Sequence, residues 1–77
     1  MNQSVKLEEK HLESLSKYRH HYELFVKTGE LIGVTQEAQN ELYDIYKLYD
    51  PYYTYNNRCG ACIGAFIVNV YKTVDNA

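Results

Sequence analysis

The sequence predicts an all-α fold, with residues 1–77 forming one small domain of three helices in which the C-terminal helix is central. Three observations support this prediction. The chain has 77 residues, of which 45% are hydrophobic and 23% charged, which suits a single small core. Two segments repeat apolar residues every three to four positions, the period of one helix face. A third segment is apolar nearly all round and has no strand-like partner.

The first helix is expected over residues 5–28. One face carries apolar or aromatic side chains at helical spacing: Leu12, Leu15, Tyr18, Tyr22 and Phe25. Gly29 then supplies the left-handed residue that commonly ends a helix. Within this helix, Arg19, His20 and His21 match no catalytic spacing, so we expect them at the surface, with the tyrosines on either side of them in the core.

The second helix is expected between Thr35 and Asp50. The Thr35 hydroxyl can cap the first turn, and Glu37 suits the positive end of the helix dipole. The apolar face consists of Ala38, Leu42, Ile45 and Tyr49. Asp50 precedes Pro51 and therefore avoids the helical conformation, which ends the helix.

The third element, over residues 61–74, is expected to be a buried helix. A strand is the alternative, because its sequence AFIVNVYKTV is rich in β-branched and aromatic residues. The length of the segment and the lack of a second strand-like run favour the helix. Gly60 and Gly64, with Ala61 and Ala65, would give this helix a smooth face for close packing with another helix.

Charge and composition exclude several functional classes. The net charge is −2, and residues 30–50 carry five acidic side chains against one basic, so nucleic-acid binding through a basic stripe is not expected. Neither an apolar run of about 20 residues nor a signal-like N-terminus is present, so we expect no membrane span and no secretion. Two cysteines fit a reducing, cytoplasmic compartment.

A chain of this size is also expected to need further burial of apolar surface for a stable fold. Folding would remove roughly 8,000 Å² from water, worth about 120 kcal/mol if some 60% of that area is apolar. Ordering 77 residues costs about the same. A partner, a metal ion or self-association would supply the missing stabilisation.

Cys59 and Cys62 form the most conspicuous motif, because two thiols three residues apart can share a metal ion or close a disulfide. At the start of a helix and beside Arg58, their pKa values should be lowered. Dithiol catalysis is one possible use, although the βαβ framework in which this spacing usually serves it is absent. The simplest alternative is that both are small buried hydrophobic residues.

A structural zinc ion would need four ligands, and His11, His20 and His21 are the other soft candidates. The two adjacent histidines point about 100° apart on a helix. A complete site within one chain is therefore not expected, whereas two chains that each give Cys59 and Cys62 could share one zinc ion. The prediction is no cofactor, with shared zinc as the alternative.

Tyrosine is unusually frequent, and six of the nine tyrosines fall within thirteen residues: Tyr43, Tyr46, Tyr49, Tyr52, Tyr53 and Tyr55. A wide apolar ring with a polar tip is typical of protein interfaces. These residues are therefore the predicted partner-binding surface, beside the acidic middle of the chain. The alternative is that the tyrosines fill the core of a protein that lacks tryptophan.

The C-terminal part resembles small proteins encoded by tailed bacteriophages, including the crAss-like group. The resemblance rests on Leu42, Tyr43, Tyr46, Tyr49 and the run from Arg58 to Ile63, less than half of the chain. It implies a phage product, either a virion component or an accessory protein that binds a host factor. No functional residue is carried over from it.

Together these observations predict a non-enzymatic helical protein that self-associates or binds another protein through its tyrosines and through the small face of Gly60 and Gly64. The alternative is a module in which Cys59 and Cys62 bind zinc or sense redox state. A helical nucleic-acid accessory is a third hypothesis, which the acidic middle of the chain disfavours.

Overall fold

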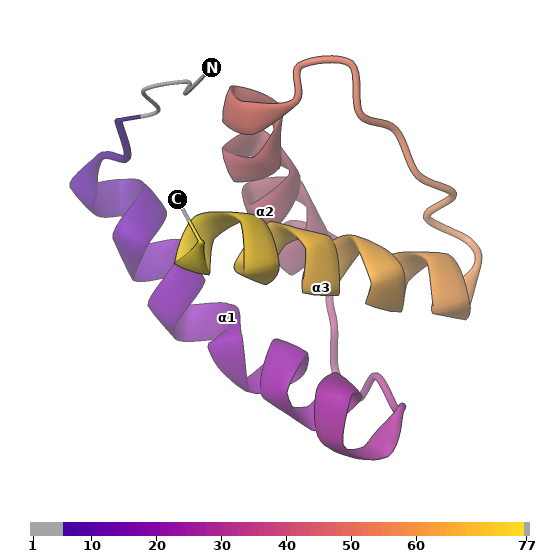
Figure 1. Cartoon of the computed structure of the whole chain (residues 1–77). Helices are drawn as coiled ribbons and strands as arrows, with labels where there is room; N and C mark the ends of the chain where they lie inside the picture. Colours follow the sequence, from indigo (N-terminus) through magenta and orange to yellow (C-terminus); the bar gives the residue numbers. More distant parts are fainter. Residues whose placement is uncertain (1–5, 77) are drawn as a thin grey trace.

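A computed structural model describes residues 6–76. Three helices, α1 (Glu9–Thr28), α2 (Gln36–Tyr49) and α3 (Gly60–Asp75), account for the regular structure of this part of the chain, which contains no strand. Each helix packs against both others, and α3 lies across the other two (Figure 1). The prediction of a three-helix domain, with a helix at residues 61–74, is confirmed.

The start of α1 differs from the prediction. Residue 5 lies outside the described residues, and residues 6–8 are not helical. The helix begins at Glu9 because Glu8 takes an extended conformation as N-cap, and its N–H donates to Nδ1 of His11 at 3.0 Å. The C-terminal end is as expected, since Gly29 has a φ of 76° and its N–H donates to the Phe25 carbonyl.

The boundaries of α2 match the sequence signals. The Thr35 hydroxyl accepts the N–H of Ala38 at 3.1 Å, and Asp50 ends the helix. The buried face of α2 contains Gln39 in addition to the expected Ala38, Leu42 and Ile45. This polar residue has a partner in the loop that follows α2, as described below.

The core lies where the three helices meet. Its nine buried hydrophobic side chains are Leu15, Tyr18, Ala38, Leu42, Ile45, Phe66, Ile67, Val70 and Tyr71. The four from α3 are each 0% exposed, so α3 is the central helix, as predicted. Leu12 departs from the predicted face and is 53% exposed, near the start of α1. None of the helices in the described part of the chain combines the length and apolar content that crossing a membrane requires.

Polar contacts fasten the end of α3 to the middle of α1. The buried Tyr71 hydroxyl donates to the Leu15 carbonyl at 2.7 Å. Arg19 makes a two-point ion pair with Asp75, at 2.9 and 3.2 Å, and its guanidinium lies 5.0 Å from the centre of the Tyr71 ring. These contacts fix the register between two helices that are far apart in sequence.

Candidate functional site

Four of the six clustered tyrosines pack around Phe66 of α3. Tyr55 stacks on Phe66 with ring centres 4.2 Å apart and ring planes 5° from parallel. Tyr53 lies 6.0 Å from the same ring, Tyr43 6.1 Å and Tyr46 6.5 Å. The loop between α2 and α3 is therefore held down by aromatic packing.

Two hydroxyl groups in this aromatic cluster have internal partners. Tyr43 donates to the carbonyl of Tyr53 at 2.5 Å, and Tyr55 donates to Oε1 of Gln39 at 2.9 Å. Burial raises the pKa of the Tyr55 hydroxyl. The second contact explains why a glutamine occupies the buried face of α2.

The predicted partner-binding tyrosines thus occupy different environments. Tyr43, Tyr46, Tyr53 and Tyr55 are half-buried in the cluster, and Tyr49 is half-buried at the end of α2. Tyr52 is 91% exposed, close in sequence to Leu48, which is 42% exposed. Partner binding through the tyrosines stays a prediction, with Tyr52 offering most of the accessible ring surface.

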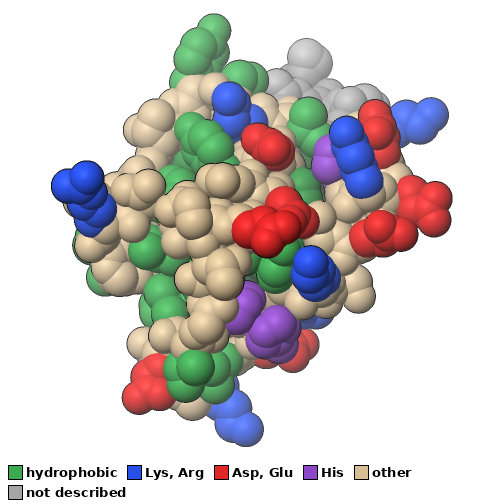
Figure 2. Space-filling view, turned by 180° about the vertical axis from the view of Figure 1, so that it is seen from behind, with side chains coloured by type: hydrophobic (Ala, Val, Ile, Leu, Met, Phe, Trp, Pro, Cys, Tyr) green, Lys and Arg blue, Asp and Glu red, His purple; other side chains and the backbone are tan. Residues whose placement is uncertain are grey.

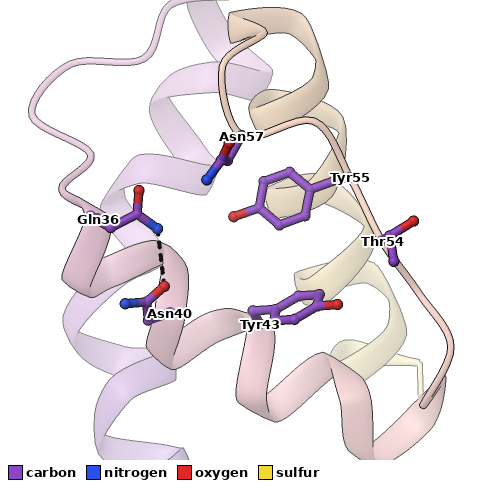
Figure 3. Close-up of a pocket in the computed structure, with 6 residues that line it drawn as sticks. All are labelled: Gln36, Asn40, Tyr43, Thr54, Tyr55 and Asn57. Carbon is purple, nitrogen blue, oxygen red and sulfur yellow. Dashed lines mark hydrogen bonds between the residues drawn. The ribbon is translucent and has the colours of Figure 1, made fainter.

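A shallow pocket of about 330 Å³ opens between the start of α2 and the tyrosine loop. Figure 3 shows its lining of amide, hydroxyl and phenol side chains: Gln36, Asn40, Tyr43, Thr54, Tyr55 and Asn57. Gln36 donates to Asn40 at 3.0 Å. With no charged side chain in its lining, the pocket offers neutral hydrogen-bonding groups only.

Cys59 and Cys62 lie together at the first turn of α3. Cys59 is the N-cap residue, and its sulfur accepts the N–H of Cys62 at 3.2 Å. Both side chains are half-buried, and the two cysteines are not bonded to each other. In residues 6–76, no group of three or more His, Cys, Asp and Glu side chains is placed to hold a metal ion.

The two thiols differ in acidity. The Cys62 thiol and the N–H groups of Cys62 and Ala61 stabilise negative charge on Cys59, which lowers its pKa. The pKa of Cys62 is raised, first by the same interaction and then by burial. The predicted lowering of both values is therefore correct for Cys59 and wrong for Cys62, since a shared hydrogen bond favours one thiolate at the expense of the other.

An apolar groove of about 440 Å³ lies beside these cysteines, between the end of α1 and the start of α3. Its lining consists of Phe25, Gly29, Leu31, Gly60 and Ala61. The chain neighbours of two lining residues, Val26 and Ile32, are each 61% exposed. This is the most apolar of the hollows described.

The two glycines predicted to pack against another helix, Gly60 and Gly64, lie in different environments. Gly64 is buried, and a Cβ there would clash with the Phe25 ring, so this glycine lets α1 and α3 approach within the molecule. Gly60 has no atom within 4 Å of a Cβ position and faces the groove. Only Gly60 therefore remains available as a surface for a second molecule.

His21 corrects the expectation that both histidines of α1 lie at the surface. Its side chain is 6% exposed, and its Nδ1 has no hydrogen-bond partner among the described residues. The rings of His20 and His21 are 4.0 Å apart, and Figure 2 shows two histidine side chains lying together. Burial and then the neighbouring His20 lower the pKa of His21, and they outweigh the backbone carbonyl of Ile32, which accepts a hydrogen bond from the ring and raises that pKa.

Sequence reasoning missed a polar junction between α1 and α2. Glu41 accepts the hydroxyl of Ser14 at 2.6 Å and that of Tyr18 at 2.9 Å. The Ser14 hydrogen bond is the main cause that lowers the pKa of Glu41. Each carboxylate oxygen accepts one hydroxyl from α1, so Glu41 joins α2 to α1.

No protein-family model, curated protein or solved structure matches this chain. Among the described residues, the groove between α1 and α3 has the more apolar lining of the two hollows, and it lies beside the turn that carries Cys59 and Cys62.

Proposed function

We propose that the protein is a small non-enzymatic helical module that acts through protein–protein contact, and that the groove between α1 and α3 is its contact surface. The observation that carries the proposal is an apolar groove of about 440 Å³ between α1 and α3, two of whose lining residues, Phe25 and Leu31, are each followed in the chain by an apolar side chain that is 61% exposed. Exposed apolar groups that gather around a hollow mark an interaction site more often than scattered ones do.

The occupant proposed is a second copy of the chain. A surface that carries both a hollow and neighbouring apolar side chains can complement itself about a two-fold axis, because each copy inserts its side chains into the hollow of the other. Gly29 and Gly60 contribute no side chain to the lining, which allows a close approach. Burial of Val26 and Ile32 in this way would add the stabilisation that so short a chain needs.

A phage context is part of this proposal. It is supported by the resemblance of the C-terminal part to small tailed-phage proteins, and the roles it suggests are a virion component or an accessory protein that binds a host factor. In either role a self-associating module would present the exposed Tyr52 and Leu48 of each copy to a third protein.

Native mass spectrometry and light scattering over a range of concentrations test the self-association. We expect a dimer for the wild type and a monomer for the double variant Val26→Glu, Ile32→Glu, because each charge would have to be buried in the interface. The control is Ser16→Glu, an exposed position on α1 outside the groove, which should remain dimeric. A wild-type monomer at every concentration would overturn the proposal, as would a double variant that dimerises like the wild type.

The same spectra recorded with added zinc test the alternative use of the cysteines. One zinc ion per dimer, lost in Cys59→Ser and Cys62→Ser, would support a four-cysteine site shared by two chains. Dimers that form equally well with and without zinc would support contact through the groove alone.

A further inference from the structure

Cys59 and Cys62 lie in an arrangement that contact through the groove does not explain. Cys59 caps α3 with its own side chain, which turns over the first helical turn to accept the N–H of Cys62 at 3.2 Å. Asn56 fixes the preceding backbone, since its carbonyl accepts the N–H of Cys59 at 3.3 Å and its side chain accepts the N–H of Arg58 at 3.0 Å. The sulfur atom of Cys59 therefore already lies over the turn that carries Cys62.

The N-cap position of Cys59 brings both thiols to the same helical turn, which suits a disulfide. A disulfide joins Cβ atoms at about 3.5–4.5 Å, so it requires two cysteines that already lie close together. Cys59 has an extended backbone, with φ −106° and ψ 116°, outside the helix proper. Its carbonyl accepts the N–H of Ile63 at 2.9 Å, so the first turn of α3 stays closed while the side chain of Cys59 rotates toward Cys62.

The two thiols are also unequal and accessible. The lowered pKa of Cys59 gives it more thiolate at neutral pH, and the raised pKa of Cys62 keeps that residue protonated. Both side chains are half-buried, so a small reagent can reach them. An accessible thiolate beside a second thiol is the arrangement of an attacking and a resolving cysteine.

We propose that Cys59 and Cys62 form a thiol–disulfide exchange centre that reduces low-molecular-weight disulfides, with Cys59 as the attacking and Cys62 as the resolving residue. The Cys59 thiolate attacks one sulfur of the disulfide RS–SR, which forms a mixed disulfide and releases RS⁻, and this takes a proton from solvent. Cys62 then loses its proton to solvent and attacks the Cys59 sulfur, which closes the Cys59–Cys62 bond and releases the second RS⁻. Two electrons pass from the protein thiols to RS–SR, which leaves as two RSH.

Oxidised glutathione is the probe, with the reduced protein, acid quenching, alkylation of free thiols and intact-mass measurement. The wild type should pass to an internal disulfide that resists alkylation. Cys62→Ser should stop at a mixed disulfide on Cys59. At neutral pH the Cys59 thiol of Cys62→Ser should react faster than the Cys62 thiol of Cys59→Ser, because the N–H groups of Cys62 and Ala61 still stabilise the Cys59 thiolate.

Two further variants separate this chemistry from general thiol reactivity. The serine hydroxyl in Cys62→Ser still donates toward Cys59, whereas Cys62→Ala removes the donor, so the pH at which Cys59 reacts half-maximally should be higher in the alanine variant. Serine at position 59 is itself a good N-cap, and circular dichroism checks that each variant stays helical. Equal rates for the two single cysteines, or a wild type that accumulates a mixed disulfide without closing the ring, would overturn the proposal. The same assay on the double variant Val26→Glu, Ile32→Glu separates this chemistry from dimerisation, because the cysteines are unchanged in it.

Discussion

His21 occupies a buried position on α1 with an unsatisfied ring nitrogen, and this makes the protein sensitive to acid. Around the ring lie His20, whose ring centre is 4.0 Å away, Tyr18, whose ring centre is 6.2 Å away, and the backbone carbonyl of Ile32, whose effect on the pKa is smaller than that of burial. None of these is a carboxylate that would favour the protonated form. Protonation of His21 therefore opposes folding, as its lowered pKa indicates.

We expect the free energy of unfolding to fall as the pH falls below about 6.5, the ordinary pKa of histidine. In this range the unfolded chain binds a proton that the folded chain does not, so stability rises with pH. Glu41 and Asp75 also have lowered pKa values, but their contributions are lost in a separate window, below about 4.5. Urea unfolding at pH 7.5 and 5.5 should show the loss in the wild type and in His20→Gln, and much less of it in His21→Gln. An equal pH dependence in His21→Gln would contradict this assignment.

Gly64 is the position on α3 where a single methyl group should matter most. Gly64→Ala is expected to destabilise the protein by about 1–3 kcal/mol, because the new Cβ would overlap the Phe25 ring. Gly60→Ala is the matched control: a Cβ there meets no atom within 4 Å, and alanine favours a helix over glycine by up to about 1 kcal/mol. Urea midpoints that shift equally in both variants would show that the α1–α3 approach is not tight at this point.

The loop between α2 and α3 behaves as a structural element although it has no regular secondary structure. Tyr55→Ala should destabilise the protein by about 2–3 kcal/mol, because it removes a ring stacked at 4.2 Å on Phe66. Tyr52→Ala, in the same loop but 91% exposed, should stay within about 0.5 kcal/mol of the wild type. Thermal unfolding of the two variants makes the comparison, and similar melting temperatures would mean that the loop does not pack on α3.

The number and ends of the helices could be predicted because they depend on local signals. Gly29, Thr35 and Asp50 end or begin helices through their own backbone preferences and hydrogen bonds. The predicted start of α1 was wrong because the helix is capped with the help of the His11 ring, which is not among the usual capping side chains. The prediction of a helix at residues 61–74 was correct although the β-branched residues of this segment favour a strand. Burial against α1 and α2 overrides the local propensity.

The candidate sites were harder to predict because they depend on tertiary contacts. Periodicity places Tyr18 and Tyr22 inward but does not show that His21, between them, would be covered as well. Tyr53 and Tyr55 have no periodicity, since they lie in a loop, and only the position of Phe66 gives them a partner. The pairing of Cys59 with Cys62 follows from their spacing, whereas the groove beside them combines residues from α1, α3 and the connector between α1 and α2.

In the whole domain each helix packs against both others. Removing any one helix would therefore expose apolar surface on the other two. The α1–α3 contact joins residues 56 positions apart, in the Tyr71–Leu15 hydrogen bond and the Arg19–Asp75 ion pair. The exposed ion pair should add at most about 1 kcal/mol. Most of the stabilisation at this contact therefore comes from the buried side chains of α3.

This long-range contact has a consequence for synthesis on the ribosome. α1 and α2 emerge first, but their shared apolar face stays open until α3, the helix with four fully buried core side chains, has left the exit tunnel. The domain therefore cannot fold before α3 is free to pack, and a chain truncated before residue 60 would expose this apolar face to chaperones and proteases.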